Sequence, residues 1–169
     1  MRPTPETLHA SERDRRAVEE ALGKPPDIPF EVVARCPDGA PLVIRDAVRD
    51  PAGAPFPTRY WLACPEAVRS VSRLEAAGWI GRLNRRAESD PGFGAALSAA
   101  HAAYARERER AEPGAGAWGG VGGTRRGVKC LHAHLAYHLA GGADPVGAWT
   151  AERTDPWHPP PATPPAAAV

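Results

Sequence analysis

The chain has 169 residues, enough for one domain with its own core. Its 21 basic and 20 acidic residues leave a net charge of +1, which disfavours nucleic-acid binding because such proteins usually show a basic excess. No apolar run reaches the ~18–20 residues that span a bilayer, and the N-terminus lacks the apolar segment of a secretory signal. We therefore expect a cytoplasmic protein without a membrane span.

The N-terminal half predicts one helix and a small antiparallel sheet. Residues 1–10 show no periodicity and are expected to be disordered. Ser11 is a good N-cap for a helix that ends at Leu22, before Gly23. Runs of β-branched and aromatic residues then predict three strands, at residues 30–35, 41–45 and 58–63.

The C-terminal half predicts helices separated by glycine and proline. Proline at a first helical position and glycine after a last one mark segments near residues 65–77, 79–88, 91–110, 126–140 and 145–149. The Pro/Ala-rich residues 154–169 show no core-forming pattern and are expected to be disordered. The predicted fold is therefore one α+β domain over residues 11–153, with four or five helices packed on one side of the sheet.

The three cysteines each fall at a predicted junction: Cys36 in a hairpin turn, Cys64 where a strand becomes a helix, and Cys130 at the start of the fourth predicted helix of this half. An odd number of cysteines without a secretory signal argues against a disulfide framework. In a helix, Cys130 and His134 share one face, whereas His132 points about 160° away from Cys130. Three thiolates with His134 or His132 would complete a Cys3His zinc site or hold an iron–sulfur cluster. Cysteine is also commonly buried without a metal, so both interpretations stay open.

A glycine-rich loop, residues 119–127, precedes that helix and carries Arg125, Arg126 and, just after it, Lys129. Glycine backbone, a helix N-terminus and cations together are suited to binding an anion such as phosphate. The alternative is a plain connector, since no Walker A motif is present. Arg69 and Arg73, with Glu66 and Glu75 nearby, indicate a solvated helix face, and His101 is expected to be a packing residue.

Four ordered segments carry a family resemblance. They are Arg35-Cys36-Pro37-x-Gly39-x-Pro41, Pro55-Phe56-Pro57-Thr58-x-Tyr60-Trp61-Leu62-x-Cys64-Pro65, Ser72-Arg73-Leu74-Glu75-Ala76-x-Gly78, and Val128-Lys129-Cys130-Leu131-His132-Ala133-His134 with the later Pro145-Val146-Gly147. Together they resemble the bacterial DUF501 family, a domain of unknown function. The resemblance implies an actinobacterial source, and it favours a metal site because all three cysteines, with His132 and His134, lie inside these segments.

Two functional hypotheses follow. In the first, a metal held by Cys36, Cys64, Cys130 and His134 stabilises a structural or partner-binding domain that has no turnover of its own. In the second, the protein is an enzyme that acts on a phosphorylated or other anionic substrate. His132 would then be the general acid/base and Lys129, with Arg125, the charge clamp. Converging sulfurs would favour the first hypothesis, and an open pocket shared by His132 and Lys129 the second.

Overall fold

A three-stranded antiparallel sheet organises the molecule. The computed structural model describes residues 8–114 and 119–154. The strands β1 (Phe30–Arg35), β2 (Pro41–Asp46) and β3 (Tyr60–Leu62) lie in the order β1-β2-β3. In this register Ile44 pairs with Val32 on one side and with Trp61 on the other. The turn between β1 and β2 contains Gly39 at a φ of 85°, a left-handed conformation that glycine adopts without a steric penalty.

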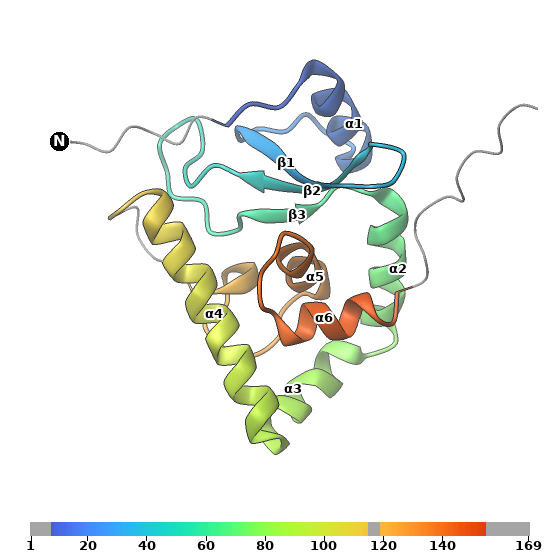
Figure 1. Ribbon diagram of the computed structural model, residues 1–169, viewed down its shortest axis with the longest axis vertical. Helices are drawn as coiled ribbons and strands as arrows, with labels where there is room; N and C mark the ends of the chain where they lie inside the picture. Colours follow the sequence, from blue (N-terminus) through green and yellow to red (C-terminus); the bar gives the residue numbers. More distant parts are fainter. Residues whose placement is uncertain (1–7, 115–118, 155–169) are drawn as a thin grey trace, which may run out of the picture.

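One face of the sheet is covered by helix α1 (Glu12–Leu22), as Figure 1 shows. The predicted caps explain its length, because the Ser11 side chain accepts a hydrogen bond from the Asp14 N–H and Gly23 ends the helix in the left-handed region. Side chains that alternate along a strand point to opposite faces. On this face a small core forms from Val18, Phe30, Ile44 and Ala63.

Five helices lie on the opposite side of the sheet and build the main core. In Figure 1, α4 forms one side of a V and α2 with α3 forms the other, while α5 and α6 lie between them. Three of the five begin with proline in the first turn, where its missing N–H costs no helical hydrogen bond. The bounds are α2 (Pro65–Ala76), α3 (Trp79–Ser89), α4 (Pro91–Ala111), α5 (Leu131–Leu139) and α6 (Pro145–Ala151).

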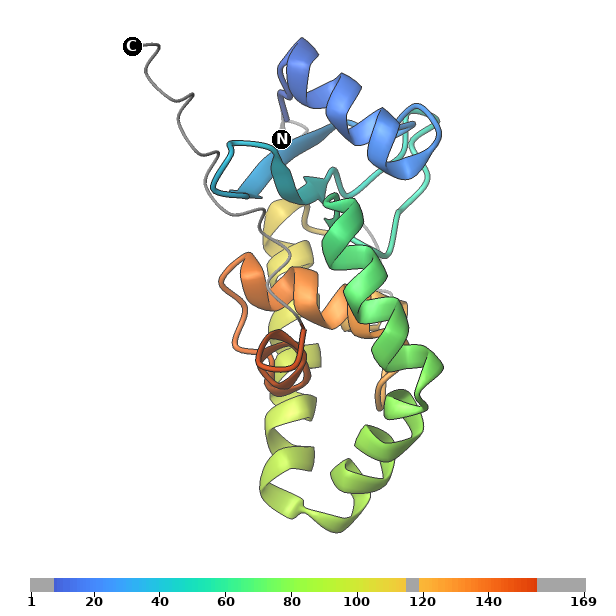
Figure 2. The same cartoon turned by 90° about the vertical axis from the view of Figure 1, so that its right-hand side faces the viewer.

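Helix α5 is the central element of this layer (Figure 2). It contacts β3, α2, α6 and the short 3-10 turn at Val121–Gly123. Six of its nine residues are buried, which fits a helix that is apolar on nearly all sides. Its Tyr137 ring lies 5.0 Å from the Tyr104 ring and 5.6 Å from the Tyr60 ring, so aromatic contacts join α5 to α4 and to the sheet.

The α+β class and the antiparallel sheet are confirmed. One helix boundary was wrong: α5 begins at Leu131 and not near residue 126, because Gly127 adopts a φ of 66° and Cys130 is extended. Leu8 is buried although it lies in the segment expected to be disordered. The predicted C-terminal tail beyond Thr154 falls outside the described residues. Within residues 8–114 and 119–154, no helix is both long and apolar enough to cross a membrane.

Candidate metal centre

The site forms where the start of α5 meets the last turn of α2. Cys130 is the N-cap residue of α5, but its side chain makes no capping hydrogen bond. Glu75, near the end of α2, supplies that cap instead, since its Oε1 accepts the Leu131 N–H at 2.7 Å. His132 follows in the first turn of α5 and lies against the same carboxylate. The hydrogen bond from Leu131 to Glu75 therefore joins α5 to α2 and brings three candidate metal ligands together.

The segment before Cys130 is positioned by a side chain of α3. Asn84 Oδ1 accepts the Val128 N–H at 2.8 Å, and Asn84 Nδ2 donates to the Val128 carbonyl at 2.9 Å. Both backbone groups of Val128 are therefore satisfied outside a helix. A side chain at Gly127 would place its Cβ 2.5 Å from Asn84 Oδ1, so only glycine fits beside this clamp.

The other two candidate ligands both lie close to one nitrogen of His132. His132 Nδ1 lies 3.2 Å from Glu75 Oε1 and 3.7 Å from Cys130 Sγ. The ligand atoms of all three residues lie within 4.8 Å of one another, and within the described part of the chain this is the one group of three or more such residues that meets that limit. The other ring nitrogen, Nε2, lies 3.1 Å from the Val68 carbonyl and 3.2 Å from Ser72 Oγ. His132 is therefore held at both nitrogens.

The electrostatics favour a positive charge between the three groups. The contact with Cys130 raises the pKa of His132 to about 9, and the Glu75 carboxylate adds to that shift while burial opposes it. About a quarter of the His132 and Glu75 side-chain surfaces is exposed. A proton on Nδ1 or a metal cation would satisfy the same requirement, because the Cys130 sulfur and the Glu75 carboxylate can both accept.

A cavity of about 400 Å³ adjoins the site. Cys130, His132 and Lys129 line it together with the free edge of β3. The rest of its wall is mostly apolar and includes Leu22, Thr58, Tyr60, Trp61, Leu62, Val68, Gly122 and Ala133. A few polar groups at one end of an apolar cavity is the usual composition of a small-molecule site.

The four ligands predicted from the sequence lie in three places. Cys130 is at the site just described, while Cys36 and Cys64 contact each other at a separate pocket. His134 is fully buried, and its Nδ1 is bonded to Asp144 Oδ2 at 2.7 Å. The helical-face argument paired Cys130 with His134, but Cys130 precedes the helix in an extended conformation. His132 is its neighbour for that reason.

Glu75 is the candidate ligand that sequence reasoning missed. It was assigned to a solvated helix face, yet its carboxylate reaches residue 131, which lies 56 positions later. Its place inside the Ser72–Gly78 segment of the family resemblance was the one available signal. Periodicity along α2 carries no information on a partner so distant in sequence.

At the predicted anion site the cations are exposed, but backbone N–H groups of the loop already donate hydrogen bonds within the protein. Arg125, Arg126 and Lys129 are exposed. The Gly120 N–H donates to the Thr124 carbonyl at 2.6 Å, and the Val121 N–H donates to His101 Nδ1 at 3.1 Å. Those N–H groups are therefore already used within the loop and by α4, whereas an anion cradle needs them free.

The protein is thus of the α+β class, with a Glu-Cys-His cluster beside an apolar cavity. Over residues 32–152 the sequence matches the family described as "Protein of unknown function (DUF501)". Because that match covers well over half of the chain, the protein belongs to the DUF501 family. No curated protein and no solved structure matches it.

Proposed function

We propose that Glu75, Cys130 and His132 bind a single divalent transition metal, with zinc the best match. The observation that carries the proposal is the convergence of one thiol, one imidazole and one carboxylate. Around tetrahedral zinc, with bonds of about 2.0–2.3 Å, neighbouring ligand atoms lie about 3.3–3.6 Å apart. The distances from His132 Nδ1, 3.2 Å to oxygen and 3.7 Å to sulfur, are close to those edges.

The surroundings of the three ligands support this proposal. A metal-bound histidine usually donates its other ring N–H to a carbonyl or carboxylate, and the Val68 carbonyl is in place for that bond. One thiolate is too few for an iron–sulfur cluster, which needs several cysteines. Zinc is therefore favoured over the cluster.

Three protein ligands leave a fourth coordination position for water or a substrate. Cys130 and His132 line the apolar cavity. The ion would therefore join α2 to α5 and could also coordinate a molecule bound in that cavity. We propose a binding role in the reducing cytoplasm, where the free Cys130 stays available to the metal. A protein partner is compatible with this role, and the balanced charge gives no support for a nucleic acid.

Metal analysis of the full chain, purified without oxygen or chelator, tests the proposal. We expect one zinc per chain and, after cobalt loading, a thiolate-to-cobalt charge-transfer band. Affinity should fall at least about tenfold in variants that each remove one ligand. These are Cys130→Ser, His132→Gln and Glu75→Gln, with Cys64→Ser, His9→Gln and Glu88→Gln as matched controls.

Two results would contradict the assignment. The first is wild-type protein that binds neither zinc nor cobalt at micromolar concentration. The second is loss of metal in Cys64→Ser as complete as in Cys130→Ser, since that would favour the ligand set first predicted from the sequence.

A second candidate function rests on one observation, that Lys129 and His132 line the same cavity. With a pKa of about 9, a metal-free His132 is protonated at neutral pH and is an acid rather than a base. Lys129 would attract an anionic group joined to an apolar body. A metal-bound imidazole nitrogen carries no proton. His132 therefore cannot be a metal ligand and a protonated acid through the same nitrogen, and the two candidate functions exclude each other.

Ligand titration separates the two candidates. Phosphate, polyphosphate and nucleotides are added to metal-free protein while the backbone amides of residues 119–132 are followed by nuclear magnetic resonance. Saturable shifts that disappear in Lys129→Ala would favour the enzyme. Unchanged amides at millimolar ligand would remove this candidate, because three exposed cations alone bind weakly in physiological salt.

A further inference from the structure

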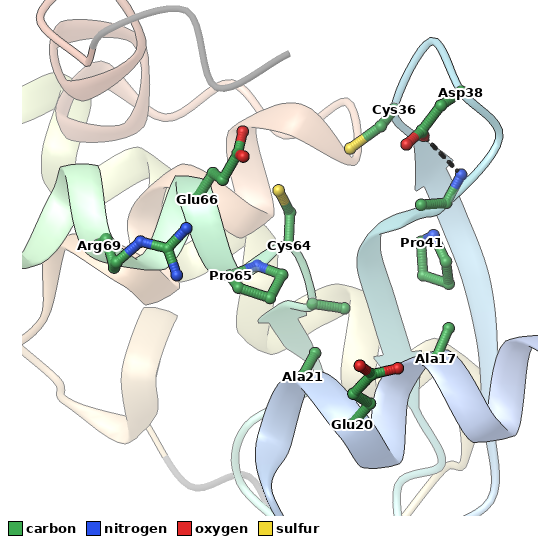
Figure 3. A pocket seen from close by; sticks show the side chains of 12 residues that line it. Ala17, Glu20, Ala21, Cys36, Asp38, Pro41, Cys64, Pro65, Glu66 and Arg69 are labelled. Carbon is green, nitrogen blue, oxygen red and sulfur yellow. Dashed lines mark hydrogen bonds between the residues drawn. The ribbon is translucent and has the colours of Figure 1, made fainter. Parts of the chain in front are cut away.

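Two cysteines far apart in sequence lie together at a second pocket, separate from the cavity beside the candidate metal centre. Cys36 directly follows β1, and Cys64 is the N-cap residue of α2. Their side chains line the same pocket, and in Figure 3 the two sulfurs are neighbours, with the Cys36 sulfur directed toward Cys64. Only 6% of Cys36 and 8% of Cys64 is exposed, so the pocket beside them is their route to solvent.

We propose that Cys36 and Cys64 form a thiol–disulfide exchange site, which closes reversibly to an intramolecular disulfide. Zinc does not fit this pair, because no third histidine, cysteine or acidic donor among residues 8–114 and 119–154 completes a cluster with it. Each sulfur also sits at the end of an element and not inside one. The hairpin turn at Cys36 and the start of α2 can make the small adjustments that disulfide geometry demands.

The two sulfurs have different roles in the exchange. Burial, the neighbouring Cys64 sulfur and the acidic groups nearby raise the pKa of the Cys36 thiol to about 12, so Cys36 stays protonated. Cys64, at the partially positive end of α2, is the attacking sulfur. Its thiolate attacks one sulfur of a small disulfide, forms a mixed disulfide and releases one thiolate.

The second step closes the protein disulfide. The released thiolate takes the proton of Cys36, and the Cys36 sulfur then attacks Cys64 Sγ and displaces the second half of the reagent as a thiolate that water protonates. Two protein thiols are oxidised to one disulfide, and one small disulfide is reduced to two thiols.

The charges on the pocket wall favour some small disulfides over others as substrates. Its volume is about 370 Å³, and its wall includes the carboxylates of Glu20, Asp38 and Glu66 against one cation, Arg69. The excess of negative charge should attract cationic reagents and repel anionic ones. The substrate class we assign is therefore a small cationic or neutral disulfide.

Closure would tie the β1–β2 hairpin to the start of α2. The disulfide would restrict the chain between residues 36 and 64 in the unfolded state. For a loop of that length we expect the melting temperature of the full chain to rise by about 5–10 °C on oxidation.

The test uses the full-length protein without oxygen. Reduced protein is mixed with cystamine (cationic), hydroxyethyl disulfide (neutral) or oxidised glutathione (anionic), and mass spectrometry follows the products. We expect loss of two hydrogens per chain, a Cys36–Cys64 crosslink in the peptide map, and a free Cys130. Cystamine should react about tenfold faster than oxidised glutathione at low salt, with a smaller ratio at high salt.

Single variants test the order of attack. Cys36→Ser should stop at a mixed disulfide on Cys64, Cys64→Ser should react at least about tenfold more slowly, and Cys130→Ser should close like the wild type. Thermal melts of the reduced variants show that each is folded. A crosslink to Cys130, a crosslink between chains, or two cysteines that remain thiols at equilibrium in the wild type would overturn the proposal.

Discussion

Replacement of Asp144 by alanine should be among the most damaging single substitutions outside the apolar core. Asp144 is completely buried, and its Oδ1 caps α6 by accepting the N–H groups of Val146 and Gly147 at 2.9 and 2.8 Å. Its Oδ2 holds His134 Nδ1 at 2.7 Å. Loss of an N-cap costs about 1 kcal/mol, and loss of a buried carboxylate–imidazole bond costs about 2–3 kcal/mol. We expect the free energy of unfolding to fall by about 3–4 kcal/mol.

The chain contains a matched control for this substitution. Asp90 also precedes a proline and caps a helix, but it caps only the Phe93 N–H, its other oxygen pairs at 3.6 Å with the half-exposed Arg86, and it is not fully buried. Asp90→Ala should therefore cost only about 1 kcal/mol. Urea denaturation of both variants, followed by circular dichroism, measures the difference. If the two variants lost the same stability within about 0.5 kcal/mol, the importance assigned to the buried His134 contact would be refuted.

Three further predictions concern other parts of the fold. Burial raises the pKa of Asp46 to about 7, so between about pH 4 and 7 the carboxyl ionises more readily in the unfolded chain than in the folded one. The free energy of unfolding should therefore fall by up to about 4 kcal/mol as pH rises through this range, and Asp46→Asn should remove that dependence. The half-exposed Arg35 guanidinium lowers the pKa of the buried Asp14 carboxyl to about 2. This pair should therefore stabilise the fold by about 1 kcal/mol above pH 4 and lose that contribution as pH falls toward 2, a loss absent in Asp14→Asn. Gly120→Ala should destabilise the fold by about 2–4 kcal/mol, because its Cβ would lie 2.4 Å from His101 Nδ1.

The same measurements contain their own controls. Asp27 is exposed, so Asp27→Asn is the matched control for the two aspartate substitutions and should change stability by less than about 0.5 kcal/mol. Gly81 is exposed in α3, and a Cβ there would meet only the Arg85 side chain at an ordinary contact distance of 3.5 Å, so Gly81→Ala should stabilise the helix by about 0.5–1 kcal/mol. A flat stability profile between pH 4 and 7 in the wild type, or equal effects of the two glycine substitutions, would contradict these predictions.

The fold was predictable where its signals are local. Ser11 and Gly23 bound α1, and the Asp-Pro pairs at 90–91 and 144–145 start α4 and α6 where the sequence placed them. Each signal acts through a side chain or backbone restriction within about three residues of the boundary. The α+β class followed from the order of such elements.

The site was only half predictable because its geometry depends on contacts between distant residues. Cys130 and His132 were candidates from composition and family resemblance. The histidine that faces Cys130 was wrongly predicted, because Asn84 binds both backbone groups of Val128 outside a helix and α5 begins only after the extended Cys130. Glu75 was missed because its role begins only when α2 and α5 are side by side.

The Asn84 clamp implies a pattern of evolutionary covariation in the family. Its amide bonds both backbone groups of Val128, as a neighbouring β-strand would, and any side chain at position 127 would collide with it. Relatives that lose the asparagine should therefore be released from the requirement for glycine at position 127, and they should vary at both positions together. Such relatives should also tolerate a longer α5, which would carry the cysteine into the helix and change which histidine it faces.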